Sequence, residues 1–248
     1  MLRLDHFVVH IDEDMDRLEQ LKLEIEPMGF PFNPKKGKET NGFKVSNIWI
    51  GDQYLELIWL KKRNSDWRKE WVDLYNEGKR GIFGLMLMTD DLDTLQDKLC
   101  RQGIPLQEPE RITFKIFGLF KKTSPWRTLY TPVIPGTDLQ IAIVQMDSSK
   151  HYDYIRKYFM KPNAEDNGIT GIRTATVRSD FSQDAWEYLH KLFPEALKMD
   201  SKLTLDMGTT QLVFENRKGV SLTVELQAVS VLPRKHQSFQ VENVLVTI

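Results

Sequence analysis

The sequence contains a single cysteine, Cys100, among 248 residues. An intrachain disulfide is therefore excluded, and a chain of this length can bury a sizeable core without one. Cys100 falls in a helix predicted over residues 91–102. There we expect the thiol to pack as a small apolar side chain rather than to act as a nucleophile.

Long apolar runs and an excess of one charge are also missing. No run approaches the roughly 18 apolar residues that span a membrane, and the N-terminal MLRLDHF lacks the apolar core of a signal peptide. The net charge is −1, and the basic runs are short and dispersed, so nothing attracts nucleic acid or an anionic membrane. We expect a cytoplasmic protein that binds neither.

Common catalytic and cofactor motifs are absent as well. The sequence has no G-x-G-x-x-G or G-x-x-x-x-G-K-[ST] for a phosphate, no H-E-x-x-H or C-x-x-C for a metal, and no G-x-S-x-G for a nucleophilic serine. We therefore expect other residues to carry the function.

The sequence does contain a unit of one strand, one helix and further strands that occurs repeatedly. β-Branched and aromatic residues predict strands, acidic starts and apolar spacing predict helices, and a tight turn at Gly51-Asp52 predicts a hairpin. The first copy has strands at 2–11, 43–50 and 53–60, with a helix after residue 12. The second has strands at 81–89, 112–118, 126–132 and 138–144, with a helix at 91–102. Asp14–Leu18 aligns with Asp91–Leu95 at an offset of 77.

A third copy begins at Gly171. It has a strand over 171–179, a helix that Ser182 caps, strands at 209–216 and 220–228 around the turn at 216–219, and one last strand over 239–248. Helices are also predicted over 63–79 and 150–160, and 161–168 is the predicted linker.

These repeats predict an α+β protein of tandem β-α-β-β-β modules. Residues 1–147 would hold two paired modules, 1–62 and 80–147, in a barrel-like curved mixed sheet. Residues 148–168 would be a helix and linker, and 169–248 a third module that covers a sheet edge, mediates a homodimer or forms an incomplete second barrel.

His6 and Glu56 stand out in the strands of the first module. His6 opens its strand beside Asp5, where it could equally be a solvated or hydrogen-bonded core histidine. Glu56 interrupts an apolar run, where a carboxylate needs a partner unless it faces solvent. If both face inward without a metal, they could form an acid/base pair in which the carboxylate raises the imidazole pKa.

The phrasing LDHFVVHIDEDMDRL … NIWIGDQYLELI resembles the glyoxalase-like branch of the vicinal-oxygen-chelate superfamily. The resemblance is good over residues 2–60, recognisable over 81–146 and weak in the third copy. It implies that two modules enclose a small-molecule cavity, often with a divalent metal held by one residue from the first and last strand of each module.

This resemblance implies His6 and Glu56 as ligands from the first module. In the second module it places Phe83 and Gln140 at the corresponding positions, and neither is a strong ligand. The metal set of His6, Glu56 and Gln140 is therefore incomplete, because a catalytic metal usually has three protein ligands. In the third copy Glu225 matches Glu56, and the His6 position falls near Ile172.

Several further residues are candidates for substrate binding. Asn47 matches the family's asparagine, although Lys44-Val45 replaces the usual Gly-Thr before it. Trp126 and Arg127 could hold a carboxylate beneath aromatic rings, or Arg127 could be a surface residue. Phe83 would line the cavity, and His10 shares the strand face of His6.

We therefore expect a glyoxalase-like small-molecule binding protein of undetermined reaction, with His6 and Glu56 as its catalytic candidates and no complete metal site. The alternative is a lyase, isomerase or dioxygenase in which His6, Glu56 and Gln140 hold a divalent ion such as Zn, Ni, Mn or Fe. A third is a resistance-type protein that only sequesters its ligand.

Overall fold

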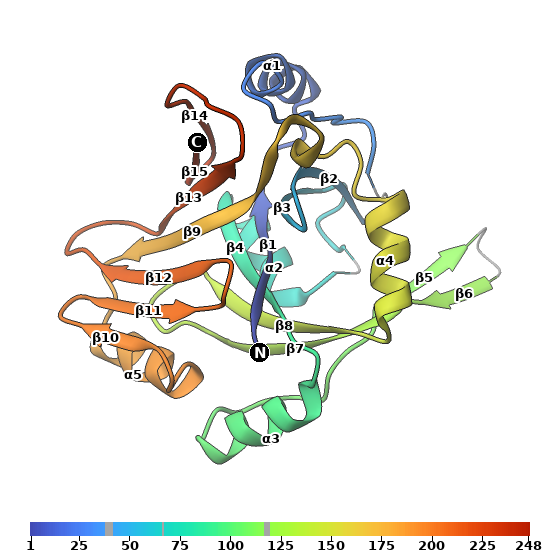
Figure 1. The fold of residues 1–248 in the computed structure, drawn as a ribbon. Helices are drawn as coiled ribbons and strands as arrows, with labels where there is room; N and C mark the ends of the chain where they lie inside the picture. The colour runs from blue at the N-terminus through green and yellow to red at the C-terminus, as the bar shows by residue number, and fades with distance from the viewer. Residues whose placement is uncertain (38–41, 66, 117–119) are drawn as a thin grey trace.

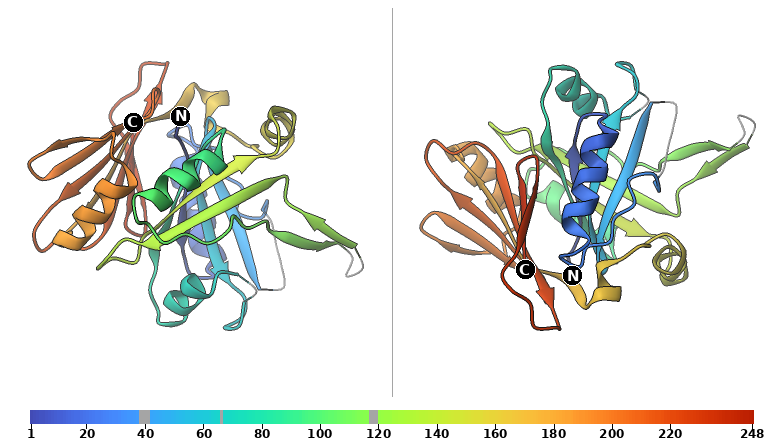
Figure 2. Two further views of the ribbon diagram at one scale, coloured as in Figure 1. Left: turned by 90° about the horizontal axis from the view of Figure 1, so that it is seen from below. Right: turned by 90° about the horizontal axis from the view of Figure 1, so that it is seen from above.

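Two large mixed β-sheets, each covered by helices, make up the molecule in a computed structural model that describes residues 1–37, 42–65, 67–116 and 120–248. Figure 1 shows the chain entering the first sheet at its N-terminal strand and ending in the second. The two views in Figure 2 show the sheets as separate layers, blue to green and orange to red. No described helix is long and apolar enough to cross a membrane.

The first sheet has six strands, and two modules meet at its centre. Its order is β2 (Phe43–Ile50), β3 (Gln53–Leu60), β1 (Arg3–His10), β4 (Gly81–Met88), β8 (Gln140–Met146) and β7 (Trp126–Val133). β1 runs parallel to β3 and antiparallel to β4, and β4 runs parallel to β8. Each module thus has its first strand at the centre and its last strand beside it. The sheet runs from β2 to β7 without closing into a barrel.

The helices of the two modules begin in the same way. Asp14 accepts a hydrogen bond from the Arg17 N–H at the start of α1 (Met15–Ile25), and Asp91 accepts one from the Thr94 N–H at the start of α3 (Leu92–Arg101). A side-chain acceptor at this position satisfies an amide that has no partner within the helix. The offset of 77 read from the sequence therefore relates equivalent positions.

The second sheet repeats the order of the first. Its strands are β10 (Leu197–Met199), β11 (Lys202–Asp206), β12 (Gln211–Asn216), β9 (Ile169–Ser179), β13 (Thr223–Ser230), β15 (Val244–Thr247) and β14 (Ser238–Val241). β9 runs parallel to β12 and antiparallel to β13, as β1 does to β3 and β4. The modular α+β fold predicted from the repeats is confirmed.

This topology corrects the reading of the third copy. β12 and β13 do not form a hairpin, because β9 lies between them. β13 is the counterpart of β4, so Glu225 does not correspond to Glu56, and it pairs instead with Arg178 at 2.6 Å. The predicted last strand is two strands, β14 and β15, which turn at Glu242 with a φ of 52°.

Other boundaries differ locally from the prediction. The helix expected over 63–79 is only α2 (Lys69–Asn76), since Asn64 and Ser65 are turn formers. Residues 113–116 and 120–123 pair as the hairpin β5–β6, and residues 117–119 of the predicted strand lie outside the described part. The predicted helix and linker contain α4 (Ser149–Tyr158) and a short 3-10 helix, Ala164–Asn167.

The first sheet has two differently covered faces. One face packs against α1 and α3 and joins the main core, which extends through the second sheet and α5 (Gln183–Leu192). The other face, here called the α2 face, forms a separate core cluster with Trp71 of α2. Its buried members are Val8, Val45, Ile58, Trp71, Phe83, Met86, Ala142 and Val144. His6 and His10 flank Val8 by strand alternation and therefore lie on the α2 face.

Candidate functional site

His6 lies between two carboxylates and against an aromatic ring. Its Nδ1 is 2.8 Å from Asp5 Oδ2, and its Nε2 is 3.6 Å from Glu56 Oε2. Tyr54 stacks on the imidazole with the ring centroids 4.3 Å apart. A register shift between Leu4 and His6 in the β1–β4 pairing marks a bulge, which lets adjacent side chains share a neighbourhood that simple alternation would separate.

These surroundings keep His6 protonated. Burial of the ring disfavours the charged form, but the charge and hydrogen bond of Asp5, followed by those of Glu56, outweigh it and raise the pKa of His6 to about 9. An imidazolium has N–H donors on both nitrogens, and each faces a carboxylate. At neutral pH the group is therefore a cation held between two anions.

Glu56 is the part of this group that a ligand can reach. Its side chain is 22% exposed, against 8% for His6 and 10% for Asp5. Asn47 lies opposite Glu56 across the β2–β3 pair, and the Asn47 Oδ1 atom is buried without a hydrogen-bond partner. A partly exposed carboxylate and a buried amide oxygen thus lie side by side on the α2 face.

The residues of the predicted metal set do not converge. Glu56, Val8, Gly84 and Gln140 are paired in one row across β3, β1, β4 and β8. Three strand spacings of about 4.8 Å separate the two ends of this row along the sheet. Gln140 Nε2 donates to the Thr131 carbonyl at 2.7 Å, while Gln140 Oε1 is buried without a partner.

The donors around His6 also do not fit a metal site. Asp5 and Glu56 lie on opposite nitrogens of the imidazole, so the three groups cannot face one ion. A metal would also have to displace a proton from a ring whose pKa is about 9. Within the described residues, no three His, Cys, Asp or Glu side chains are grouped to hold an ion.

Two other predicted residues lie on opposite faces of β7. Trp126 packs against the core cluster of the α2 face. Arg127 points the other way, where its guanidinium donates to Asp93 of α3 at 2.6 Å and to Gln145 at 2.7 Å. The structure therefore does not bring Arg127 together with His6 and Glu56.

The other predicted residues lie beneath α2. Phe83 is buried in the core cluster, with its ring centroid 4.0 Å from that of His10. Trp71 covers Gly84 so closely that a Cβ atom there would lie 3.0 Å from the Trp71 ring. Phe83 and His10 therefore share a face with His6, and α2 covers them.

Sequence reasoning gave no role to Arg68 or Tyr152. Arg68 precedes α2 and places its guanidinium carbon 3.6 Å from the Tyr130 ring centroid, beside Glu110 at 3.3 Å. Burial and the nearby Asp5 charge raise the pKa of Tyr152 in α4 to about 12. Both come from helical segments outside the repeated strands, so the family phrasing carried no signal for them.

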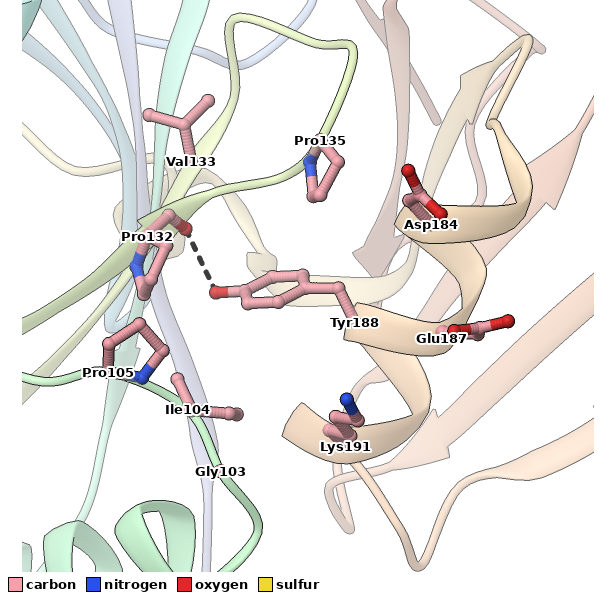
Figure 3. A pocket seen from close by; sticks show the side chains of 10 residues that line it. All are labelled: Gly103, Ile104, Pro105, Pro132, Val133, Pro135, Asp184, Glu187, Tyr188 and Lys191. Carbon is pink, nitrogen blue, oxygen red and sulfur yellow. Dashed lines mark hydrogen bonds between the residues drawn. The ribbon is translucent and has the colours of Figure 1, made fainter.

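A surface groove of ≈ 280 Å³ lies elsewhere, between the second module and α5. Figure 3 shows Tyr188 reaching across it from α5 to the Pro132 carbonyl, to which it donates at 2.9 Å. None of the predicted site residues lines this groove.

Comparison with known proteins identifies the family. The glyoxalase-like domain family matches residues 4–193, which is more than half of the chain. The chain belongs to this family. The resemblance to glyoxalase-like proteins stated from the sequence is therefore confirmed. A search of curated proteins finds no match.

One solved structure shares the fold of the whole chain, and others match part of it. A hypothetical protein from Staphylococcus aureus is 16% identical and has a TM-score of 0.72, with 100% of this chain and 98% of that chain covered. Methylmalonyl-CoA epimerase from Streptomyces coelicolor is 15% identical with a TM-score of 0.43, covering 59% of this chain and 95% of its own. Methylmalonyl-CoA epimerase from Mycobacterium tuberculosis is 14% identical with a TM-score of 0.43, and the match covers 60% of this chain and 91% of that chain. At 16% identity the likeness to the Staphylococcus aureus protein concerns the fold alone.

Proposed function

We propose that this glyoxalase-like protein binds a small molecule on the α2 face and acts on it through the His6–Glu56 pair without a metal ion. The observation that carries the proposal is the placement of His6, with Asp5 on one nitrogen and Glu56 on the other. Glu56 would accept a hydrogen bond or proton from the ligand, and His6 would stabilise the carboxylate or return a proton. Asn47 Oδ1 supplies a second acceptor beside it.

The direct test is a metal-binding measurement joined to a titration. We expect equilibrium dialysis against Mn²⁺, Zn²⁺ or Ni²⁺ to give less than one ion per chain, with no change in His6→Ala or Glu56→Ala. We also expect NMR of the His6 ring to show a pKa near 9. Stoichiometric binding that both substitutions abolish would overturn the metal-free site.

That opposite outcome would favour the second candidate, a divalent-metal-dependent lyase, isomerase or dioxygenase. The observation in its support is the unpartnered Gln140 Oε1 on the α2 face, since an amide oxygen can bind a hard cation. A resistance-type protein that only sequesters its ligand would use the same face. A ligand found by NMR screening separates catalysis from sequestration, because only catalysis converts the ligand to a new compound.

A further inference from the structure

His10 is fully buried on the α2 face, and both of its ring nitrogens lack a hydrogen-bond partner. Four aromatic rings surround it, here called the aromatic box, at centroid distances of 4.0 Å for Phe83, 5.5 Å for Trp67 and Tyr75, and 6.3 Å for Trp71. Unpartnered polar atoms in such a place are costly, because nothing replaces the water they lose. A phenylalanine would fill the same space without that cost.

The imidazole in the box is neutral and keeps its hydrogen-bonding capacity. Burial, followed by the nearby Arg80 charge, lowers the pKa of His10 to about 3. Arg80 itself is paired with Asp12 at 2.7 Å and lies over the Tyr75 ring. A neutral imidazole has one N–H donor and one nitrogen acceptor, so His10 can bind an uncharged ligand group that carries a donor or an acceptor.

One wall of the box is less enclosed than the others. Trp67 comes from the irregular segment before α2 and is only partly buried, whereas Trp71 and Phe83 are fully enclosed. Its ring stacks on Phe43 with the centroids 4.7 Å apart and lies against His10. If the Trp67 side chain swings outward, it leaves a flat space between Phe43 and His10.

We propose that Trp67 occupies the apolar end of the ligand site, and that a planar aromatic group bearing an N–H or O–H takes its place, stacking on Phe43 and hydrogen-bonding to His10. This inference rests on the proposed function, because the polar end of the same ligand would reach Glu56. Glu56 pairs with Val8, two residues before His10 on the neighbouring strand, so the backbone positions of the two ends lie about 8 Å apart. The ligand class is a small aromatic compound with a polar end.

Indole is a suitable probe, since it reproduces the displaced ring and carries one N–H. We expect calorimetry to show that Trp67→Ala binds indole at least tenfold more tightly than the unaltered protein. Adding His10→Phe to Trp67→Ala should weaken indole binding at least tenfold. N-methylindole lacks the N–H donor, so Trp67→Ala should not bind it comparably more tightly than the unaltered protein does. His10→Phe alone should raise the melting temperature, because it removes the unpaired nitrogens.

A cavity that merely accepts apolar molecules would bind indole equally well with Phe at position 10, and that result would overturn the proposal. No gain of affinity in Trp67→Ala or in the milder Trp67→Leu would also overturn it, and the second variant covers a failure of the first to fold. A His6 pKa near 9 together with a failed indole test would refute only the proposal that the aromatic box binds a ligand. An ordinary His6 pKa together with successful indole binding would refute only the polar site.

Discussion

His6 shows how a single residue acquires unusual chemistry from its neighbours. Its charge depends on Asp5, which the bulge in β1 brings to Nδ1, and on Glu56 from the parallel strand β3. His10 is buried on the same face without a carboxylate partner, and burial followed by the nearby Arg80 charge lowers its pKa instead. The two histidines are four residues apart, yet their pKa values of about 9 and about 3 lie on opposite sides of the ordinary value.

The raised pKa of His6 predicts how stability depends on pH. Below the ordinary value of 6.5 both the folded and the unfolded protein hold the proton, so the stabilisation is fully present. As the pH rises from 6.5 to about 9 the unfolded chain gives up its proton first, and the stabilisation is lost. We expect urea unfolding to show on the order of 3 kcal/mol of this contribution at pH 6 and almost none at pH 10.

The comparison protein for this measurement is His6→Gln, which has no titrating ring. Its free energy of unfolding should converge on that of the unaltered protein as the pH rises. Parallel pH dependences for the two proteins would contradict the prediction.

Removing Asp5 should return His6 toward ordinary behaviour. Asp5 provides the largest of the influences that raise the His6 pKa, so Asp5→Asn should lower that pKa while Glu56 remains in place. A titration followed by NMR of the imidazole measures the change directly. Asp52→Asn, at an exposed position, is the control. An unchanged His6 pKa in Asp5→Asn would show that Glu56, and not Asp5, keeps the pKa of His6 high.

At the scale of elements, α2 covers one face of the first sheet. Its Trp71 packs against Val8 and Phe83, and its N-terminal neighbour Arg68 lies on Tyr130. The close approach at Gly84 leaves no room for a side chain beneath the Trp71 ring. The same helix thus completes the core cluster and covers part of the candidate site.

Gly84→Ala should therefore loosen α2. The added Cβ would lie 3.0 Å from atoms of both Trp71 and Val8, and overpacking of this kind costs about 1 to 3 kcal/mol. We expect faster proteolysis in residues 61–68 and lower stability to urea. Trp71→Phe provides a smaller ring, so Gly84→Ala should lower the free energy of unfolding by less in that variant. An equal loss with Trp71 and with Phe at position 71 would show that the Trp71 ring is not the obstacle.

At the scale of the whole molecule, side chains rather than shared strands connect the two sheets. Gln53 donates to Thr210 at 2.8 Å and accepts from the Ile172 N–H at 2.6 Å. The Asn163 amide binds both the N–H and the carbonyl of Gly51, at 2.9 and 2.8 Å. On the other side of the molecule, Tyr188 of α5 bonds to the strand β7 (Figure 3).

We expect Asn163→Ala to weaken this connection. It would leave the buried N–H and carbonyl of Gly51 without partners, at a cost of about 1 to 3 kcal/mol. Chemical unfolding can be followed by tryptophan fluorescence, which reports mainly on the first sheet, and by circular dichroism, which reports on both sheets. In Asn163→Ala we expect these two probes to give different unfolding midpoints. Asn76→Ala is the matched control, because Asn76 donates to the Arg63 carbonyl at an exposed position, and a surface change of this kind costs less than about 0.5 kcal/mol.

The sequence predicts the helix starts and the pairing of the first two modules, but not every strand or strand order. Asp14 and Asp91 predicted two helix starts, because capping depends on neighbouring residues alone. β10 and β11 were missed, since 197–206 is short and largely polar. Glu225 was matched to the wrong strand because β12 and β13 are adjacent in sequence but separated by β9 in space. Arg127 faces α3 rather than the site, a direction that the family phrasing did not indicate.

The sequence by itself determined the repeated module, the family and the presence of His6 and Glu56 in neighbouring strands, because these follow from short-range patterns of residue type. Only the tertiary structure decided the chemistry of those residues. Protonation, access and metal fit depend on which side chains meet from different strands and helices. Examples are Asp5 at the bulge, Gln140 three strands away from Glu56, and α2 over the aromatic box. These contacts are set by packing between elements that are distant in the sequence, and the spacing of residues along the chain does not indicate them.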